Sequence, residues 1–386
     1  MKKKIIHFVI DDKFIQDSVK CFQMASLTED TFYLVSIDEN YSLKYENRFI
    51  NIVSEAKAIK MVTNGSYDAL VLHSLYALSP HILRVVNPSI KVIWFGWGYD
   101  MYNNYFPYKP LIPWCIFKEK TARLHNSFNW KNTRIKLTEP VKRVVYKDKY
   151  SVKVVNEALE RIDFFAGVFE EEYDLLKKNN KHIRAKKAVH NYIHPEEFDK
   201  KDINLIDHTE GNNILLGNSG GDTNNHIDVL SLLYNVTGGN LGDIKIICPL
   251  SYGGKKKYVE RVLTAGHQMF GDSFEPLTTF LPIDEYNRIV GSCKNVLFGH
   301  MRQAATCNCL TSMWKGLKLF MYEDSMDYMH YRDEGLKVFS LDKDLSVDTL
   351  GINLTDEEIL FNRTKIEQRY SYRQWKEDLA IILQSI

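Results

Sequence analysis

Short apolar runs alternate with longer polar stretches along most of the chain. The apolar runs at residues 5–10, 68–75, 91–97 and 162–168 predict strands, and the stretch EEEYDLLKK that follows predicts a helix with acidic residues at its start. Near-continuous apolar strands separated by helical stretches are typical of a parallel sheet that is covered on both faces. The first part of the chain is therefore predicted to form an α/β unit.

A second series of such segments follows the polar stretch at residues 190–210, which contains Pro195 and predicts a linker. Strands are predicted in NILLGN, DIKIICPL, LTTFLP, KNVLFGH, LKLFMY and KVFSLD, with helices between them. The expected fold is α/β, with doubly wound, Rossmann-like units at residues 1–195 and 205–355. The helices predicted at 356–386 could pack back on the first unit. Because ligands bind outside the carboxyl ends of such strands, the two units are expected to face each other across a cleft.

Composition and charge narrow the class of protein. An apolar content of 45% and a charged content of 26% fit a soluble globular protein, and a net charge of +1 gives no general attraction to nucleic acid. No run approaches the roughly 18 apolar residues of a membrane span, and the apolar part of MKKKIIHFVIDD is too short for a signal peptide. The six cysteines form no CxxC pair, which is typical of reduced, buried thiols. We expect a cytoplasmic protein, for which peripheral contact with a membrane stays open.

The stretch GNSGGDTNNH joins a predicted strand to a predicted helix. Gly217 follows the strand, and Asp222 or Thr223 is a plausible N-cap for a helix that begins near Asn224. A helix N-terminus with flanking glycines can leave backbone N–H groups free for a diphosphate. An ordinary turn with a good cap has the same composition, because turns favour glycine, asparagine and aspartate. The pattern alone leaves both interpretations open.

Polar and aromatic residues also follow strands of the first unit. Asp12 comes after the first strand, where a carboxylate could act as a general base towards an acceptor hydroxyl. In WFGWGYD, Trp97 beside Gly98 could stack its ring on a sugar, and Asp100 could accept hydrogen bonds from the hydroxyl groups of that sugar. His73 ends another strand in a comparable position. The alternatives are structural: a helix N-terminal acid, a buried aromatic cluster and a core histidine.

The second unit contains FGHMRQAATCN, where Arg302, Gln303 and Thr306 lie between a strand and a helix. A guanidinium group binds phosphate oxygens through two hydrogen bonds, so Arg302 and the turn at 217–219 could form a diphosphate clamp without a metal. The alternative is a surface arginine without a ligand. The acid pair in DKD at 342–344 is interpreted as a solvated turn.

Basic residues outnumber acids at residues 108–149, where tryptophan and phenylalanine residues are interleaved. Such a stretch can lie on anionic lipid or bind single-stranded nucleic acid, or it can be a solvated face with core aromatics. The near-neutral charge of the whole chain argues against nucleic acid.

Several of these motifs, taken in order, resemble glycosyltransferase family 56. The resemblance is carried by IIHFVIDD, WFGWGYDMY, GNSGGDTNNH, KIICPLSYGGKKKYVERVLTAG, FLPIDEYNRIVGSC and RQAATCNCL. It implies a GT-B fold, with an acceptor-binding N-terminal domain and a nucleotide-sugar-binding C-terminal domain. It also implies a TDP- or UDP-sugar donor, an undecaprenyl-diphosphate-linked glycan acceptor at the cytoplasmic membrane surface, and no essential metal or other cofactor.

The resemblance also implies roles for individual residues. Donor-binding residues would be Gly217, Asn218, Ser219, Asn225, His226, Pro249, Tyr252, Phe280, Leu281, Tyr286, Arg302, Gln303 and Thr306. Asp12 is the first candidate for the base on the acceptor side and Asp100 the second, with His73, Trp97 and Gly98 as acceptor-binding residues.

Three hypotheses remain at this point. The first is a glycosyltransferase of bacterial surface polysaccharide synthesis that transfers a 4-acetamido-dideoxyhexose or a related sugar. The second is a nucleotide-sugar epimerase of the same architecture, which would alter the donor without an acceptor. The third is a protein that binds nucleotides or glycans without turnover.

Overall fold

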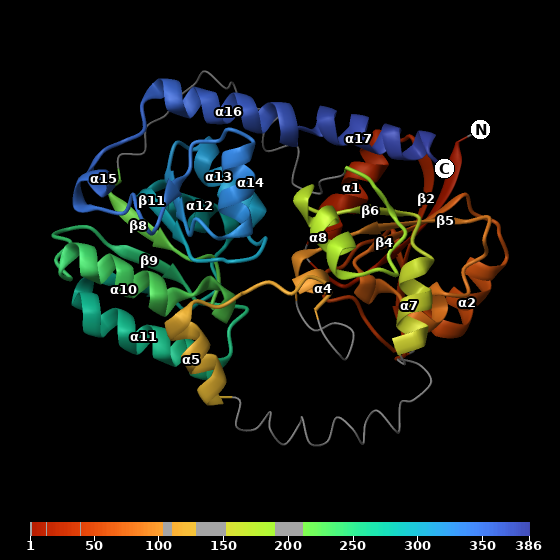
Figure 1. The fold of residues 1–386 in the computed structure, drawn as a ribbon, viewed down its shortest axis with the longest axis horizontal. Helices are drawn as coiled ribbons and strands as arrows, with labels where there is room; N and C mark the ends of the chain where they lie inside the picture. Colours follow the sequence, from red (N-terminus) through yellow and green to blue (C-terminus); the bar gives the residue numbers. More distant parts are fainter. Residues whose placement is uncertain (1, 13, 39, 103–109, 129–151, 190–210) are drawn as a thin grey trace. The chain divides into compact units, whose positions relative to one another are not determined.

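The structure is a computed structural model that describes residues 2–12, 14–38, 40–102, 110–128, 152–189 and 211–386 (Figure 1). The chain forms two compact units. Unit 1 comprises Met1–Pro113, Lys136–Asp199 and Tyr370–Ile386, and unit 2 comprises Trp114–Ile135 and Lys200–Arg369. The predicted linker at 190–210 and most of the basic stretch at 108–149 lie outside the described residues.

A parallel sheet forms the centre of unit 1, with the strand order β3-β2-β1-β4-β5-β6-β7. Its strands are β1 (Lys3–Val9), β2 (Thr28–Ser36), β3 (Ile50–Ser54), β4 (Ala69–His73), β5 (Lys91–Phe95), β6 (Phe164–Ala166) and β7 (Lys186–Lys187). The chain winds outward from β1 in one direction through β2 and β3 and in the other direction from β4 onward. The order therefore reverses between β1 and β4.

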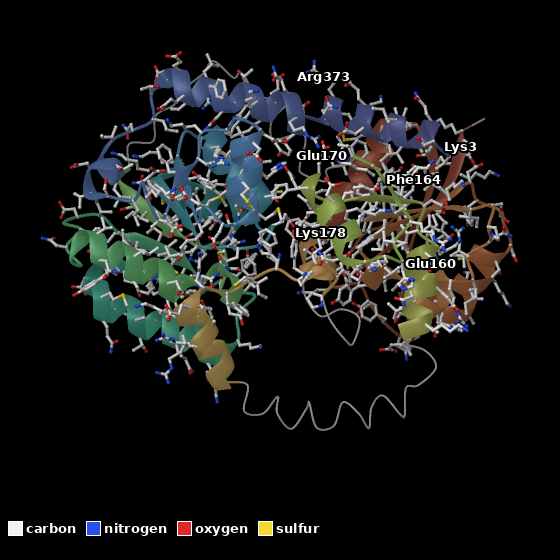
Figure 2. All side chains as sticks on the ribbon, viewed as in Figure 1. Lys3, Glu160, Phe164, Glu170, Lys178 and Arg373 are labelled. Atoms are coloured by element: carbon white, nitrogen blue, oxygen red, sulfur yellow. The ribbon has the colours of Figure 1, made fainter. Side chains whose placement is uncertain are left out.

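Helices cover both faces of this sheet (Figure 1). They are α1 (Ile15–Ala25), α2 (Glu55–Thr63), α3 (Pro80–Leu83), α4 (Gly98–Tyr102), α7 (Val152–Glu160), α8 (Glu171–Asn179) and α17 (Tyr372–Gln384), and the short helix η1 spans Leu75–Ala77. Helix α17 is amphipathic. Figure 2 shows Arg373 on its solvent side, whereas Trp375 is 1% exposed and packs edge-on against Phe22 of α1 at 5.3 Å between ring centroids. The C-terminal residues from 370 onward thus complete the core of unit 1.

Unit 2 has a second parallel sheet, with the strand order β10-β9-β8-β11-β12-β13. Its strands are β8 (Asn213–Leu216), β9 (Ile246–Pro249), β10 (Phe274–Leu277), β11 (Cys293–Phe298), β12 (Lys318–Met321) and β13 (Phe339–Ser340). Its helices include α5 (Glu119–Phe128), η2 (Asp222–Asn224), α10 (His226–Thr237), α11 (Lys256–Phe270), η3 (Gly271–Ser273), α12 (Ile283–Gly291), α13 (Thr306–Trp314), α14 (Met326–Asp333), α15 (Val347–Gly351) and α16 (Asp356–Tyr370). Here the strand order reverses between β8 and β11.

Helix α5 belongs to unit 2, although the sequence analysis placed its residues in the first unit. It lies beside α10 (Figure 1). The Asp228 carboxylate on α10 accepts hydrogen bonds from the backbone N–H groups of Lys120 at 2.8 Å and Thr121 at 2.9 Å, and from the Thr121 hydroxyl at 2.7 Å. These amides lie in the first turn of α5, where a helix has no acceptors of its own. Asp228 therefore caps α5 from another helix.

Most predicted strands are present within one to three residues of their expected ends, but LTTFLP is wrong. Strand β10 ends at Leu277, where the segment starts, because Phe274–Leu277 pairs in register with Ile246–Pro249. The following Thr278, Thr279 and Phe280 are exposed and form a loop. In the described part of the chain, no helix is both long and apolar enough to cross a membrane.

The cysteines are free thiols in the structure, but not all of them are buried. Cys21, Cys248, Cys293 and Cys309 lie inside, as predicted. The expected burial is wrong for Cys115, which is exposed, and Cys307 is only partly buried.

Candidate functional site

Each sheet offers one ligand-binding position at the point where its strand order reverses. In open α/β sheets, ligands bind outside the carboxyl ends of the strands at this point, because the connections diverge there and leave a crevice. In unit 2 the position lies between the ends of β8 and β11, and in unit 1 between the ends of β1 and β4. The candidate residues of the two units are therefore considered one sheet at a time.

In the turn after β8, hydrogen bonds occupy the backbone N–H groups of Gly217, Asn218 and Gly220, which corrects the expectation that these amides are bare. The N–H of Gly217 donates to the Leu297 carbonyl at 3.0 Å, and the N–H of Asn218 donates to Asn224 Oδ1 at 2.9 Å. The N–H of Gly220 donates to the Tyr252 carbonyl at 2.8 Å. Gly217 is needed for its backbone angle, φ +71°, and because a Cβ there would lie 2.7 Å from His226 Nε2. The N–H groups of these three residues are therefore satisfied within the fold.

The expected caps of the following helix are also wrong. Asp222 and Thr223 lie in η2, and α10 begins at His226 after Asn225, which has φ 51°. The buried Asn225 side chain donates to the Gly299 carbonyl at 2.7 Å and accepts from the Lys118 N–H at 2.8 Å. Its amide therefore joins β11 to the segment before α5, which is a structural role and not contact with a donor.

Side chains gather where the backbone amides are occupied. His300, which follows β11, has its Nε2 atom 3.2 Å from Asn218 Oδ1, after β8. Because an amide oxygen accepts, His300 Nε2 carries the proton, and His300 Nδ1 has no hydrogen-bond partner in the described part of the chain. Arg302 is partly buried and donates to the Gln303 carbonyl at 2.6 Å. The sequence analysis quoted FGHMRQ but missed His300, whose position directly after a strand was the available signal.

Both histidines at this position are neutral. Burial lowers the pKa of His226 to about 3, against a raising effect of the Ser219 backbone. Burial lowers the pKa of His300 to about 3 as well, and the charges of Arg302 and His226 act in the same direction. His226 Nδ1 lies 3.1 Å from the Tyr258 hydroxyl. Arg302 is therefore the cation of this cluster, and the imidazoles contribute hydrogen bonds without adding charge.

The start of α13 completes the position between β8 and β11. Gln303 is buried and donates from Nε2 to Thr306 Oγ1 at 2.7 Å. Ala305 precedes the helix with φ 54°, a left-handed conformation that costs a residue with a Cβ about 1–2 kcal/mol. In the part of the chain that the structure describes, no side chain caps this helix start. Strain of this kind is concentrated at functional sites.

An aromatic edge lies beside the turn after β8. Tyr252 follows β9, which ends at Pro249, and its hydroxyl donates to the Asn218 carbonyl at 3.0 Å. The Phe280 ring is 74% exposed and meets the Tyr252 ring edge-on at 6.4 Å. Leu281 and Tyr286 are partly buried, and burial raises the pKa of Tyr286, with a contribution from Tyr252. The structure thus brings Asn218, Ser219, Tyr252 and Phe280 to one edge.

In unit 1, Asp100 is not exposed as a base would be. It is fully buried, and it accepts from the backbone N–H groups of Leu75 at 2.9 Å and Trp97 at 2.8 Å and from the indole of Trp94 at 3.0 Å. Burial raises the pKa of Asp100 to about 7, against the lowering effect of these hydrogen bonds. Asp100 therefore joins the segments after β4 and β5, and its predicted role as an alternative base is wrong.

The predicted acceptor-binding residues of unit 1 are also buried. His73 Nε2 lies 3.0 Å from Nδ1 of His7, within the core below α1 and α17. Trp97 is 4% exposed and belongs to the same core, and Gly98 is buried at the start of α4. The structure thus contains the structural alternatives, a core histidine and a buried aromatic cluster. These side chains are buried because alternate residues of the strands face the covering helices.

The two acids after β1 have different roles. Asp11 accepts hydrogen bonds from the Tyr41 hydroxyl at 2.7 Å and from the N–H groups of Lys44 at 2.6 Å and Tyr45 at 3.1 Å, so it anchors the loop after β2. These bonds hold the pKa of Asp11 below its ordinary value, against the raising effect of its partial burial. Asp12 is partly buried, and from the described residues its carboxylate accepts one hydrogen bond, from the N–H of Phe14 at 3.1 Å. Asp12 keeps the position expected of a base.

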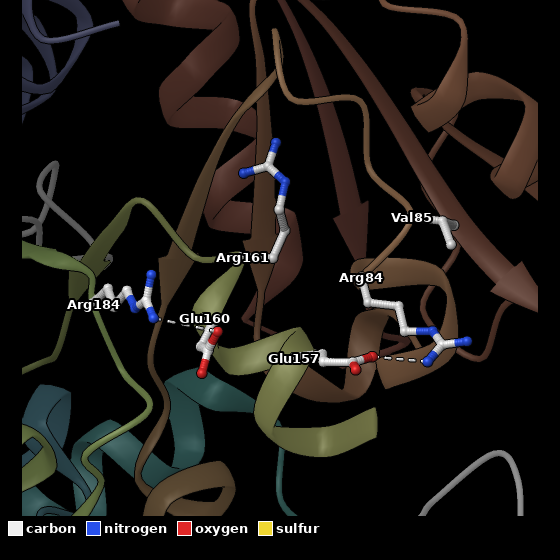
Figure 3. Close-up of a pocket in the computed structure, with 6 residues that line it drawn as sticks. All are labelled: Arg84, Val85, Glu157, Glu160, Arg161 and Arg184. Atoms are coloured by element: carbon white, nitrogen blue, oxygen red, sulfur yellow. Dashed lines mark hydrogen bonds and ion pairs between the residues drawn. The ribbon is translucent and has the colours of Figure 1, made fainter. Parts of the chain in front are cut away.

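A cavity of about 430 Å³ in unit 1 is lined by Arg84, Val85, Glu157, Glu160, Arg161 and Arg184 (Figure 3). Its charges are paired, with Arg84 2.8 Å from Glu157 and Arg184 3.7 Å from Glu160. It lies before the starts of β5, β6 and β7, at the opposite edge of the sheet from the switch point. Among the described residues, no three His, Cys, Asp or Glu side chains gather so as to hold a metal ion.

Residues 130–350, more than half of the chain, match the family described as 4-alpha-L-fucosyltransferase glycosyl transferase group 56. The whole chain is also similar in fold to solved structures. These include Anabaena HepE in complex with UDP and glucose, with a TM-score of 0.62, 10% identity and 100% of both chains covered. The lipopolysaccharide outer core galactosyltransferase WaaB matches with a TM-score of 0.59, 8% identity and coverage of 100% of this chain and 99% of that one. AviGT4, a glycosyltransferase involved in avilamycin A biosynthesis, matches with a TM-score of 0.53, 8% identity and coverage of 99% and 97%. The predicted GT-B fold of two doubly wound α/β units is confirmed.

Proposed function

The chain belongs to glycosyl transferase group 56, and from this membership we propose that it transfers a 4-acetamido-dideoxyhexose or a related sugar from TDP or UDP to a glycan carried on a lipid diphosphate. The predicted enzyme class, a hexosyltransferase that uses a nucleotide-sugar donor, is confirmed by the family. Of the three hypotheses, we therefore keep the glycosyltransferase and set aside the epimerase and the binding protein without turnover. The sugar, the lipid carrier and a role in surface polysaccharide synthesis are the proposed part.

The cluster of Asn218, His300 and Arg302 carries the proposal for the donor. These side chains follow β8 and β11, the two strands that flank the switch point of unit 2. A diphosphate there would receive hydrogen bonds from the Arg302 guanidinium and the start of α13. Phe280 and Tyr252 offer ring faces for the base at the same edge. HepE, which shares the fold, is in complex with UDP and glucose, and this supports a uridine nucleotide as one candidate.

The reaction needs stabilisation of the leaving nucleoside diphosphate and removal of one proton. An acceptor oxygen attacks the anomeric carbon, the bond from that carbon to the β-phosphate oxygen breaks, and the nucleoside diphosphate leaves. We assign stabilisation of its negative charge to Arg302 in place of a metal ion, and removal of the acceptor's proton to Asp12. A lipid-linked acceptor would place the protein at the cytoplasmic face of the membrane.

Nucleotide binding tests this proposal. We expect UDP or TDP at about 100 times its Kd to raise the melting temperature by about 5 °C, with the same shift in excess EDTA. Arg302→Ala should remove most of the shift, because the diphosphate loses its cation. Arg261→Ala is the matched control, since Arg261 is an exposed arginine of α11 in the same unit. An unchanged shift in Arg302→Ala, or a shift that EDTA abolishes, would exclude the proposed clamp.

A further inference from the structure

A row of aromatic rings runs from the core of unit 1 to the switch point of its sheet. The Phe14 and Trp97 rings are 5.9 Å apart, the Trp97 and Tyr99 rings 5.7 Å, and the Tyr99 and Tyr76 rings 5.3 Å. Tyr76 follows β4, Tyr99 follows β5, and Asp12 follows β1. The row therefore ends where β1 and β4 diverge, the position at which a doubly wound sheet binds its ligand.

The end of this row is exposed, whereas its base is fixed. Tyr76 is 44% exposed and Tyr99 is partly buried, but Trp97 beneath them is only 4% exposed. Burial raises the pKa of the Tyr99 hydroxyl, and the negative charges of Asp100 and Asp12 raise it further. A tyrosine ring supported in this way presents a flat apolar face to solvent, and Asp12 follows β1, the strand next to β4.

The backbone that carries Tyr76 is strained and is held by several hydrogen bonds. Ser74 has φ 90° and ψ 147°, a region that residues with a side chain avoid at a cost of about 1–3 kcal/mol. Its N–H donates to the Phe95 carbonyl at 3.1 Å, and its hydroxyl oxygen accepts from the Tyr76 N–H at 3.1 Å. Asp100 accepts from the Leu75 N–H at 2.9 Å. Buried polar groups thus fix the direction of an exposed ring, which core packing alone does not require.

A ring face beside a carboxylate suits a sugar. The C–H groups on one side of a pyranose pack against an aromatic face, and its hydroxyl groups donate to a carboxylate. A phosphate would meet repulsion from Asp12, so the chemistry favours the neutral ring of a glycan over its charged carrier.

We propose that Tyr76, Tyr99 and Asp12 form a binding platform for the pyranose ring of the acceptor, with Asp100 and Ser74 as positioning residues. The platform replaces the buried His73 and Trp97 as the acceptor contact of unit 1. The assignment of its ligand as the acceptor depends on the proposed function, in which the donor occupies unit 2.

Saturation-transfer NMR with simple glycosides tests the platform. The probes are methyl β-glucopyranoside and methyl N-acetyl-β-glucosaminide, which present three axial C–H groups on one face. UDP and TDP are measured in the same samples. We expect saturation of these axial protons by the wild-type protein and binding about tenfold weaker in Tyr76→Ala. Tyr76→Phe should bind like wild type, because it keeps the ring. Tyr234→Ala is the matched control, since Tyr234 is 41% exposed and also meets a second ring edge-on, at 5.9 Å from Phe270.

Each outcome separates this inference from the donor proposal. Glycoside binding that is absent in wild type, or equal in wild type and Tyr76→Ala, overturns the platform even when UDP binds normally. Wild-type protein that binds neither UDP nor TDP instead overturns the donor proposal. A thermal melt of Tyr76→Ala that matches wild type shows that weaker glycoside binding comes from the lost ring.

Discussion

Two aspartates of unit 1 show how environment separates chemical from structural roles. Asp12 is partly exposed and accepts a single hydrogen bond from the described residues, so its carboxylate can approach a substrate. Asp100 is enclosed, and two backbone N–H groups and an indole occupy its oxygens. The same side chain is available for proton transfer at one position and committed to the fold at the other.

Replacement by asparagine is expected to lower catalysis at Asp12 and stability at Asp100. Asp12→Asn should leave the unfolding free energy within about 0.5 kcal/mol of wild type and lower kcat by about 10²–10⁴, because an amide cannot accept the proton. Asp100→Asn should cost about 2–3 kcal/mol, since its NH₂ group faces N–H donors. Urea unfolding measures the unfolding free energy. Release of UDP or TDP from a nucleotide-hexose in the presence of lipid-linked glycan extract measures kcat. Normal turnover in Asp12→Asn would remove Asp12 as the base.

The sequence indicated candidate side chains at strand ends, but not which of their atoms already have hydrogen-bond partners. Residues at strand ends could be found because an apolar run stops there, and Asn218, Arg302 and Asp12 all follow this rule. Which atoms stay available depends on partners elsewhere in the chain. Asn224 occupies the Asn218 N–H, and the Tyr252 carbonyl occupies that of Gly220. No local pattern of small and amide residues records such pairings, so the prediction of bare amides at Gly217 and Asn218 is wrong, and the location of the donor site stays a prediction.

At the scale of elements, the link between α5 and α10 is the feature least visible in the sequence. Strands and helices follow from apolar periodicity, which is local. The assignment of α5 to unit 2 depends on the pairing of Asp228 with amides 107 or more positions away in the chain. Strand β2 and the edge strand β3 were missed for a related reason: exposed and partly buried positions interrupt their apolar pattern.

The cap from Asp228 predicts a local and a global effect. Asp228→Asn should lower the unfolding free energy of unit 2 by about 2 kcal/mol, because its NH₂ group cannot accept from the amides of α5. Hydrogen exchange of the first turn of α5 should accelerate by more than that of α10. The control is Asp243→Asn, an exposed aspartate of the same unit. Equal exchange of α5 in wild type and Asp228→Asn would show that α5 is held by other contacts.

At the scale of the whole molecule, the described carboxyls whose pKa burial raises above its ordinary value lie in unit 1, and the histidines whose pKa burial lowers to about 3 lie in unit 2. Unit 1 also contains His7, whose pKa burial lowers. Unit 1 contains Asp100, and Glu172, whose pKa burial raises to about 8, partly offset by hydrogen bonds to the Phe169 backbone and the Tyr102 side chain. Unit 2 contains His226 and His300, whose pKa values burial lowers to about 3. A carboxyl with a raised pKa stabilises the fold at low pH, and a histidine with a lowered pKa stabilises it at higher pH. The two units should therefore respond to acid in opposite directions.

Between pH 8 and 6.5, folded unit 1 takes up protons at Glu172 and Asp100 that its unfolded chain, with pKa values near 4.5 and 3.8, does not. Its stability should rise as the pH falls, by up to about 1.4 kcal/mol per pH unit for each group that binds a proton. In the lower part of this window His7 opposes the effect in part, because burial lowers its pKa in the folded unit while the unfolded imidazole begins to bind protons near pH 6.5.

Below pH 6.5, the unfolded chain of unit 2 protonates His226 and His300 while the folded unit does not, so its stability should fall at a similar slope per histidine. Hydrogen-exchange mass spectrometry at constant denaturant, corrected for the intrinsic pH dependence of exchange, follows peptides from β4 and β5 separately from those of β8 and β11. Glu172→Gln should flatten the slope of unit 1 alone, and His300→Asn should halve that of unit 2 alone. If stability changed with pH in the same direction in both units, the pH dependence would come from groups other than these two carboxyls and two histidines.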